Sequence, residues 1–386
     1  MKAGWVIKRL SEVSTFKPPK SEARAKLAKT DEVSFAPMED LGIDQKYLNP
    51  SRTCVFSEVA GSYTYFADGD VLLAKITPCF ENGKLGIARQ LIKGIGFGSS
   101  EYFVIRPHAE LKSEYLYYFL LQQSFREQGA RSMKGAVGHK RVSKEFLETH
   151  EIPIPPAAAQ QRIVAILDEA FDNIAKARAN AEQKLRNARE LFESYVHFAF
   201  AQCGANWRVK TLNQIATNMD NKRIPITKRD RKPGKYPYYG ASGIVDYVAE
   251  YIFDGDTLLV SEDGANLLAR STPIAFPASG KYWVNNHAHI LKFEDMATQR
   301  FVEFYLENIK LDEYITGAAQ PKLNQKALNS IPIPIPDSVA DQMLVVTALE
   351  QVAAETQRLE SIYKQKLAAL DELKQSLLHQ AFSGKL

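Results

Sequence analysis

The stretch Ile152-Pro-Ile-Pro155 occurs a second time as Ile333-Pro-Ile-Pro336, and the sequences that follow the two copies also match. Past one inserted residue, the offset between the copies stays at 182. The matching pairs are Gln183-Lys184-Leu185 and Gln365-Lys366-Leu367, Glu190-Leu191 and Glu372-Leu373, Ser194 and Ser376, His197 and His379, and Ala199-Phe200 and Ala381-Phe382. A repeat with a period of about half the chain predicts two structural copies of one unit.

Shorter motifs upstream of the two copies also recur in the same order. Trp5-x-x-Lys8-x-Leu10 matches Trp207-x-x-Lys210-x-Leu212, and Asp68-Gly-Asp70 matches Asp254-Gly-Asp256. Each half therefore consists of a mixed segment of about 150 residues, a proline-rich hinge and a long helix. The expected parts are a first mixed domain over 1–151, a hinge and central helix over 152–202, a second mixed domain over 203–330, and a hinge and C-terminal helix over 331–386.

The mixed segments carry signals for both strands and helices, which places the chain in the α/β (α+β) class. Asp-Gly turns precede short apolar runs, and aromatic and aliphatic residues alternate further along each half. The expected strands are 71–74, 102–105, 257–260 and 289–293, and the expected short helices are 114–123 and 298–307. The order of the strands within their sheets does not follow from one sequence.

After each hinge, apolar residues recur at spacings of three and four with charged residues between them. This is the pattern of a coiled-coil seam. The seam positions include Ile163, Leu167, Ile174, Leu185, Phe192 and Tyr195 in the first copy, and Leu349, Leu359, Leu370, Leu373 and Leu377 in the second. A lone helix cannot bury such a stripe, so the two helices are predicted to pair as an antiparallel coiled coil with pseudo-twofold symmetry. Core packing or homodimerisation is the alternative for either helix.

Composition limits the class of protein. The chain has 386 residues, of which 45% are hydrophobic and 24% charged, and this is typical of a globular protein with two or three domains. We find no secretory signal and no apolar run of the roughly eighteen residues that a membrane span needs. Cys54, Cys79 and Cys203 form no CxxC pair, which argues against a disulfide framework or a zinc site. We therefore expect a soluble, cytoplasmic protein.

Motifs for catalysis are missing, or are better explained as structure. No phosphate-binding G-x-x-x-x-G-K-[ST] loop occurs, and Gly94-Ile-Gly96-Phe-Gly98 lacks the third glycine of a dinucleotide-binding loop. Asn49-Pro50-Ser51-Arg52 is not the Asn-Pro-Pro-aromatic signature of amino-methyltransferases. His287 and His289 have no third ligand at a suitable spacing, so packing or hydrogen bonding is favoured over metal binding. Glu262-Asp263-Gly264 and the Asp-Gly-Asp motifs are interpreted as turns. We expect no enzymatic activity, no cofactor and no metal.

The net charge is only +4, but basic residues are concentrated in two segments. Residues 208–235 hold nine Lys or Arg and two acids, a local net charge of +7, and residues 131–144 hold five basic residues and no acid. Such cations bind phosphates with release of counterions, and arginine also contacts guanine edges. The candidate DNA-binding residues are Lys222, Arg223, Lys228, Arg229, Arg231, Lys232, Lys235, Tyr238 and Tyr239, then Arg131, Lys134, His139, Lys140 and Arg141, and Lys322 in the duplicate segment Gly317–Asn324. A solvated basic loop is the alternative.

Several of these stretches resemble the specificity subunit of type I restriction-modification systems. The hinge from Ile152-Pro-Ile-Pro-Pro156 to Gln160-Gln161-Arg162-Ile163 is similar to the family's IPLPP-x-x-x-QQRI motif, and residues 370–384 are similar to its C-terminal helix. Residues 99–107 and 235–243 resemble segments of its target recognition domains. The second hinge departs from the pattern, because Asp337-Ser-Val-Ala-Asp-Gln342 lacks the Pro-Pro and Gln-Gln pairs.

The resemblance implies a non-catalytic subunit that binds double-stranded DNA. Each recognition domain would read one half of a split site. Two methylation subunits and, in the full complex, restriction subunits would bind the helices, and S-adenosylmethionine, ATP and magnesium would belong to those partners. Two other classes remain open: a coiled-coil adaptor that binds only protein, and a nuclease with a scattered acidic site.

Overall fold

The computed structural model describes residues 4–136, 138–201, 204, 206–317 and 320–386. Cys203, Val137, Ala318-Ala319 and the expected boundary between 202 and 203 lie outside the described residues. The chain forms two compact units: Met1–Ala181 with Gln365–Leu386, and Glu182–Lys364. We call the mixed part of unit 1 (4–156) the first domain and the mixed part of unit 2 (206–338) the second domain.

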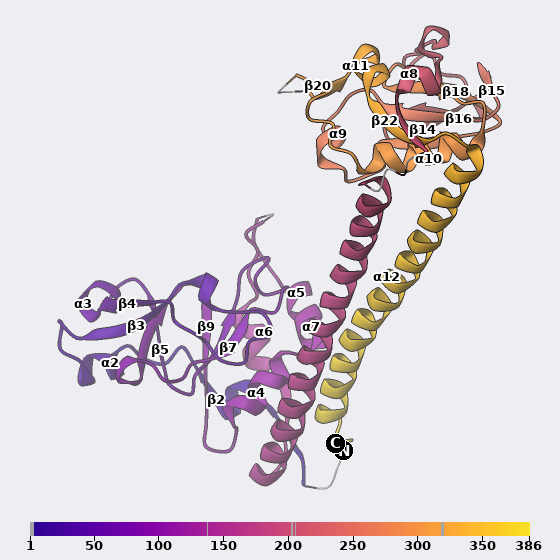
Figure 1. The fold of residues 1–386 in the computed structure, drawn as a ribbon. Helices are drawn as coiled ribbons and strands as arrows, with labels where there is room; N and C mark the ends of the chain where they lie inside the picture. The colour runs from indigo at the N-terminus through magenta and orange to yellow at the C-terminus, as the bar shows by residue number, and fades with distance from the viewer. Residues whose placement is uncertain (1–3, 137, 202–203, 205, 318–319) are drawn as a thin grey trace. The chain divides into compact units, whose positions relative to one another are not determined.

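The first domain is built on three small sheets (Figure 1), with the strand orders β1-β10, β2-β9-β6-β7 and β4-β3-β8-β5. Strand β6 is buried on both faces: Val71 and Leu73 pack in a core with α4, whereas Leu72 and Ala74 pack in a second core. The elements are β1 (Val6–Arg9), α1 (Leu10–Val13), β2 (Ser14–Phe16), α2 (Ser21–Lys26), β3 (Glu32–Ala36), β4 (Arg52–Val55), α3 (Phe56–Val59), β5 (Thr64–Ala67), β6 (Val71–Ala74), β7 (Leu85–Ile87), β8 (Ile95–Gly98), β9 (Tyr102–Pro107), α4 (Ser113–Leu120), α5 (Gln123–Arg131), α6 (Lys144–Thr149) and β10 (Glu151–Ile154).

The second domain repeats this topology with its own strands. Its sheets have the orders β11-β22, β12-β19-β16-β17 and β14-β13-β18-β15, with a short β20-β21 hairpin added. The elements are β11 (Trp207–Thr211), α8 (Leu212–Ile215), β12 (Thr217–Asn218), η3 (Asp220–Lys222), β13 (Pro233–Gly240), β14 (Gly243–Val248), β15 (Phe253–Asp254), β16 (Thr257–Ser261), α9 (Asn266–Ala269), β17 (Ala275–Ala278), β18 (Lys281–Val284), β19 (Ala288–Lys292), α10 (Met296–Asn308), β20 (Ile315–Thr316), β21 (Lys322–Leu323), α11 (Gln325–Ser330) and β22 (Pro332–Pro336). The matching strand orders confirm the internal duplication.

The expected strands and short helices are confirmed in place, with small shifts at their ends. Strands β6, β9, β16 and β19 cover the four predicted runs, and α10 covers the predicted helix 298–307. The predicted helix 114–123 is shorter, because α4 ends at Leu120 and a new helix, α5, begins at Gln123. Gly96 lies in β8, and an added Cβ there would come within 2.3 Å of the Phe66 ring. This glycine-rich segment is therefore a closely packed strand.

Each hinge is fixed by one buried glutamine. In unit 1 the Nε2 atom of Gln160 donates to the carbonyl oxygens of Pro155 at 3.0 Å and Glu110 at 2.8 Å. In unit 2 the Nε2 atom of Gln342 donates to the Pro336 carbonyl oxygen at 2.9 Å, and its Oε1 accepts from the Thr298 hydroxyl at 2.6 Å. The second hinge thus keeps the geometry of the first although it lacks the Pro-Pro and Gln-Gln pairs.

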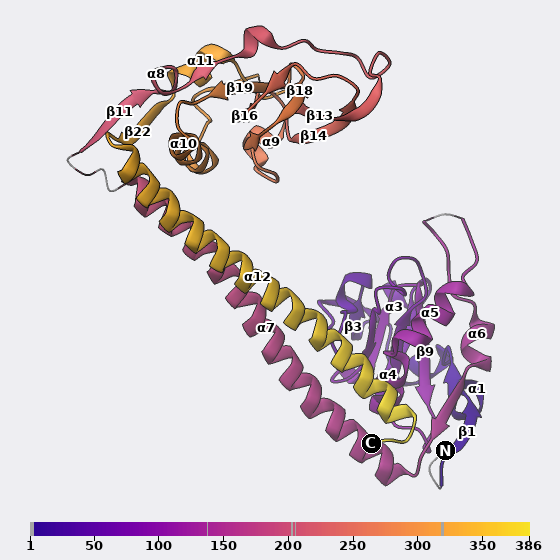
Figure 2. The same cartoon turned by 90° about the vertical axis from the view of Figure 1, so that its right-hand side faces the viewer.

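The long helices are α7 (Ala157–Ala201) and α12 (Val339–Phe382), of 45 and 44 residues. Within unit 1 the start of α7 and the end of α12 share a core through Leu167 and Leu378, and Arg178 pairs with Asp371. Within unit 2 the end of α7 and the start of α12 meet, and Arg189 pairs with Glu360 at 2.8 Å. In each unit the two helix stretches therefore run antiparallel and side by side (Figures 1 and 2), as predicted.

Burial follows the predicted seam except at the end of α12. Ile163, Leu167, Ile174 and Leu349 are buried and the other predicted seam residues are half-buried, but Leu373 is 47% exposed. Leu378 is fully buried in its place. The apolar face shifts here because α12 also packs against the first domain, where the Phe382 ring lies 5.0 Å from that of Tyr115 and 5.3 Å from that of Phe119.

None of the helices in the described residues combines the length and the apolar character that crossing a membrane requires.

Candidate nucleic-acid interface

The basic segment of the second domain begins in β11, and most of its cations lie between η3 and the start of β13. Lys222, Lys228, Arg229 and Lys232 are exposed, and among the described residues none of the four forms an ion pair. Because no ion pair holds these side chains, they remain available to bind phosphate.

One arginine and two tyrosines of the same segment have other roles. The Arg231 side chain is only 17% exposed, pairs with Asp246 at 3.2 Å and lies 4.3 Å from the Tyr238 ring centroid. Tyr238 is 1% exposed and its hydroxyl bonds the Ile226 backbone, while Tyr239 packs in an interior cluster against Phe276. The expected DNA contacts by Tyr238 and Tyr239 are therefore not supported, because their rings help build the domain.

Arg223 is also held inside the second domain. Its side chain is 15% exposed, and its guanidinium pairs with Glu262 at 2.6 Å and with Asp220 at 3.5 Å. It also donates to the carbonyl oxygen of Ala288 at 3.0 Å. The expectation that Arg223 contacts DNA conflicts with this placement, because leaving these partners would strand buried carboxylates.

Arg223 belongs to a buried charge network with four other groups. The His289 ring is bonded to Asp220 at 2.5 Å through Nδ1 and to the Leu323 carbonyl oxygen at 2.7 Å through Nε2. Glu262 also pairs with Lys322 at 3.1 Å. Burial would raise the pKa of Glu262 and of Asp220, but the bonds from Arg223 and His289 outweigh it, and both pKa values lie below their ordinary range. The network anchors the start of the basic loop to β16, β19 and β21.

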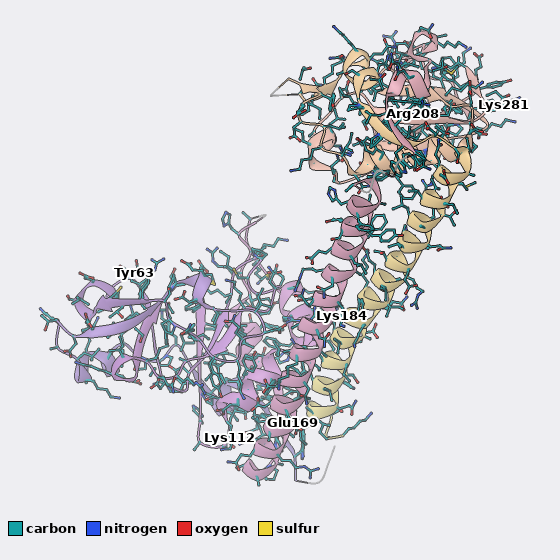
Figure 3. The ribbon with its side chains drawn as sticks, in the orientation of Figure 1. Tyr63, Lys112, Glu169, Lys184, Arg208 and Lys281 are labelled. Atoms are coloured by element: carbon teal, nitrogen blue, oxygen red, sulfur yellow. The ribbon has the colours of Figure 1, made fainter. Side chains whose placement is uncertain are left out.

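An aromatic and basic edge flanks the basic loop. Lys235 Nζ lies 5.3 Å from the Tyr236 ring centroid, the Tyr236 and Tyr251 centroids are 5.0 Å apart, and Lys281 Nζ lies 4.6 Å from the Tyr251 centroid. Lys281 is exposed on β18, at the edge of the second domain (Figure 3). Tyr251 and Lys281 were not predicted, because only the sheet brings them beside Lys235.

The basic segment of the first domain forms a hairpin. The backbones of Lys134 and Arg141 exchange hydrogen bonds of 3.0 and 2.9 Å, and His139 and Lys140 lie exposed between them. Arg131 is the exposed last residue of α5. The Arg141 guanidinium binds Glu101, with Nη2 to Oε1 at 2.8 Å. Arg131, Lys134, His139 and Lys140 are thus free to meet a ligand, while Arg141 is partly neutralised.

Arg141 and Lys322 occupy equivalent positions in the two domains. In each domain the backbone N–H of the next residue donates to the carbonyl oxygen of the residue that follows β6 or β16. Val142 donates to Lys75 at 2.9 Å, and Leu323 donates to Glu262 at 2.8 Å. This agrees with the expectation that Gly317–Asn324 duplicates the basic hairpin, although Lys322 is paired with Glu262.

The first domain also has basic residues that sequence reasoning missed. Lys17, Lys20, Lys75 and Lys144 line one concavity of about 380 Å³. They come from widely separated segments, and of the four only Lys144 belongs to a basic segment that the sequence singled out, 131–144. Only the fold brings them together.

The histidine pair does not form a metal site. His289 is buried, whereas His287 precedes β19, is half exposed and bonds Asp263 at 2.8 Å. No group of three or more metal-ligating side chains occurs among the described residues. The preferred interpretation of both histidines as hydrogen-bonding residues agrees with these contacts.

Comparison with known proteins identifies relatives of both halves. A family model described as "Type I restriction modification DNA specificity domain" matches residues 2–185 and 205–369. The EcoEI type I restriction enzyme specificity subunit from Escherichia coli is 39% identical over 165 residues, which are 42% of this chain and 27% of that relative. The matches cover 27% and 48% of the first two curated relatives, so the chain spans much less than their full length.

Two solved structures share the fold over the whole chain. One, described as the "Structural basis underlying complex assembly and conformational transition of the type I R-M system", has a TM-score of 0.81 at 17% identity and covers 100% of this chain and 99% of that chain. The other, the HsdS subunit from Thermoanaerobacter tengcongensis, has a TM-score of 0.66 at 19% identity, with 100% and 98% covered. At these identities they bear on the fold alone. The family model matches most of both halves, and this chain therefore belongs to the type I restriction-modification DNA specificity family.

Proposed function

We propose that this chain is the specificity subunit of a type I restriction-modification complex, and that its two domains each read one part of a split site on double-stranded DNA. The observation that carries the proposal is the row of unpaired exposed cations at Lys222, Lys228, Arg229 and Lys232 beside the aromatic and basic edge of the second domain. Phosphate contacts by such cations supply affinity and position the protein, and base contacts supply specificity.

The proposed partners follow from the family. Two methylation subunits bind the long helices, and restriction subunits join in the full complex. S-adenosylmethionine, ATP and magnesium act on those partners, and this chain contributes recognition without catalysis. Because its substrate is the cell's DNA, we place the complex in the cytoplasm.

The test is binding of the full chain to a DNA duplex of about three helical turns. Affinity measured between about 50 and 200 mM salt gives a slope that falls by about 0.9 for each lost phosphate contact. The variant with Lys228→Met, Arg229→Met and Lys232→Met is expected to bind more weakly and with a shallower slope. A matched variant with Arg162→Met, Lys184→Met and Lys366→Met, all exposed on α7 and α12, is expected to bind like the wild type.

The same measurement separates the proposal from the adaptor alternative. An adaptor that binds only protein has no salt-dependent affinity for duplex DNA. Such a result for the wild-type chain, and for the chain assembled with methylation subunits, would overturn the proposed function.

A further inference from the structure

The concavity of about 380 Å³ in the first domain, which we call the lysine cavity, has an unusual lining. Four of its lining residues are lysines and, within the described part of the chain, none is an acid. Its remaining walls are mostly aromatic, aliphatic and hydroxyl side chains. The residues on which the inference depends are Lys17 and Lys20 from the loop after β2, Lys75 after β6, Lys144 at the start of α6, and Tyr63 and Phe103 in the walls.

Lys144 pairs with Glu148 at 2.6 Å, and the other lysines of the cavity are only partly neutralised by the protein. Lys20 Nζ donates to the carbonyl oxygens of Ala60 at 3.1 Å and Gly61 at 2.7 Å, and Lys75 Nζ donates to that of Ser100 at 2.7 Å. The carboxylate of Glu101 is 3.9 Å from Lys75, but it also binds Arg141. An ammonium has three donors, so both lysines keep hydrogen-bonding capacity toward the cavity.

The cations also repel one another. Burial lowers the pKa of Lys20, and the nearby charges of Arg24 and Lys17 lower it further. Burial is likewise the main cause of the lowered pKa of Lys75; the charge of Glu101 opposes the shift, while Arg141 and Lys17 add to it. A site with crowded, partly desolvated cations gains stability when an anion enters.

The second domain provides an internal comparison at the same place in the fold. Lys17 N donates to Val104 O at 2.9 Å, as Met219 N donates to Ile290 O at 2.8 Å. Lys75 N donates to Glu101 O at 3.0 Å, as Glu262 N donates to His287 O at 2.9 Å. The equivalent residues are therefore Pro18 and Asp220, Lys75 and Glu262, and Phe103 and His289.

The two domains balance charge differently at this place. In the second domain Asp220 and Glu262 supply two carboxylates, and Arg223 inserts its guanidinium between them. In the first domain proline replaces the first carboxylate and Lys75 replaces the second. The second domain is thus neutralised from within, whereas the first keeps an excess of positive charge around an open cavity.

We propose that the lysine cavity holds a backbone phosphate of the bound DNA, with Lys17 and Lys75 facing the phosphate oxygens and the Tyr63 and Phe103 rings against the adjoining sugar. The proposal rests on the proposed DNA-binding function and gives the first domain a phosphate contact that the second domain lacks at the equivalent position. Lysine binds phosphate as a point charge and does not require bidentate geometry.

The test uses the full chain with Lys17→Met and Lys75→Met, because methionine keeps the apolar stem of each side chain. With the same duplex and salt series, the double variant is expected to reduce the salt slope by about 1 and to weaken binding several-fold at low salt. The control is Lys112→Met, a half-buried lysine (Figure 3) outside the cavity, which is expected to keep the wild-type slope. An unchanged salt slope in the double variant, with normal DNA binding by the wild type, would show that the lysine cavity holds no DNA phosphate, and it would leave the proposed function intact.

A second variant keeps every lysine and supplies the missing carboxylate. Pro18→Asp imitates Asp220, and we expect it to lower the salt slope as the double variant does, provided circular dichroism shows a folded chain. Titration with inorganic phosphate distinguishes a phosphate of the DNA backbone from a free phosphate ion as the ligand of the cavity. If phosphate alone binds wild type below millimolar concentration and loses affinity in the double variant, while the DNA slope is unchanged, the ligand is a free anion and the proposal is wrong.

Discussion

The guanidinium of Arg223 and the side chains of Lys228 and Arg229 belong to one basic run, yet their surroundings differ completely. Arg223 bonds Glu262 and the Ala288 carbonyl oxygen inside the domain, while Lys228 and Arg229 are exposed. At the residue scale, charge density in a sequence identifies a surface but does not separate residues that bind a ligand from residues that support the loop.

The first prediction follows from this difference. Arg223→Met is expected to lower the free energy of unfolding of the second domain by about 3 kcal/mol, because it leaves Glu262 and Asp220 buried with fewer partners. Urea unfolding followed by fluorescence measures the change. The control Arg229→Met is expected to stay within about 0.5 kcal/mol of the wild type. Equal stability of the two variants would show that the buried network contributes little.

The second prediction concerns pH. The pKa values of Asp220 and Glu262 are lowered in the folded state. The two carboxylates therefore contribute fully to the free energy of unfolding above their unfolded pKa values of about 4, and this contribution is lost as the pH falls through the lower folded pKa values. The free energy of unfolding of the wild type is expected to drop in this acidic range. Arg223→Met should show a flatter dependence below pH 5 or so, and a parallel pair of curves would contradict the role given to Arg223.

How much of the site the sequence predicts depends on the residue. Lys222, Lys228, Arg229 and Lys232 are exposed, as expected of a run rich in cations, and their contact with DNA stays a prediction. Tyr238 was misplaced because alternation along β13 decides which ring is buried, and the register of β13 with β14 and β18 is a tertiary property. The lysine cavity escaped detection because its residues are separated by up to 127 positions in the chain, from Lys17 to Lys144.

At the scale of elements, each hinge depends on a glutamine that is out of contact with water. Gln160 is 0% exposed and Gln342 is 5% exposed, and both bond a prolyl carbonyl oxygen at the start of a long helix. One glutamine is thus enough at each hinge, and the neighbouring Gln161 is exposed.

The third prediction compares these neighbours. The Lys112 N–H donates to Gln160 Oε1 at 2.9 Å. Gln160→Leu is expected to lower the free energy of unfolding by about 1–3 kcal/mol, because it leaves this N–H and the Pro155 carbonyl oxygen without partners. Gln161→Leu is expected to have almost no effect. Thermal unfolding of both variants tests this, and a loss of stability in Gln161→Leu as large as that in Gln160→Leu would refute the assigned role.

The fourth prediction uses two leucines on α12. Leu378→Ala is expected to lower the free energy of unfolding of unit 1 by about 2–5 kcal/mol, because Leu378 is fully buried. Leu373→Ala, five residues away and 47% exposed, is expected to change it by less than about 0.5 kcal/mol. Denaturant midpoints of the two variants test this. If the seam predicted from the sequence held to the end of α12, Leu373→Ala would be the more destabilising substitution.

The elements themselves were more predictable than their arrangement. Long helices follow from a periodicity sustained over many turns, and Asp-Gly turns place the strands that follow them. Strand order was not predictable, because β6 pairs with β9 and β7, and residues 71–74 contain no signal for either neighbour. The internal duplication reduces this gap, because the strand order of one domain predicts the strand order of the other.

At the scale of the whole molecule, α7 continues without a break from Ala157 in one unit to Ala201 in the other. A continuous helix does not stretch, and sliding it past α12 would separate apolar partners at a cost of about 1.5–3 kcal/mol for each buried side chain. The fifth prediction is that the spacing between the two halves of the proposed split DNA site is fixed to about one base pair, since each added pair shifts a half-site by about 3.4 Å and 35°.

This prediction is tested with the complete methylating complex and a DNA series that differs only in spacer length. A single preferred length is expected, with a sharp loss of affinity on either side. Equal affinity over three consecutive lengths would mean that the helices act as flexible tethers.

The division of the chain into units has a consequence for biosynthesis. Unit 1 needs Met1–Ala181 and also Gln365–Leu386, whereas unit 2 is the continuous stretch Glu182–Lys364. On the ribosome, at about 5–20 residues per second, residue 365 follows residue 181 after roughly 10–40 s. Throughout that interval Leu378 is not yet present to cover the apolar stripe of α7, and Phe382 is not yet present to pack against the Tyr115 ring. The half that is translated first is therefore completed last, and part of its apolar surface stays uncovered until α12 emerges.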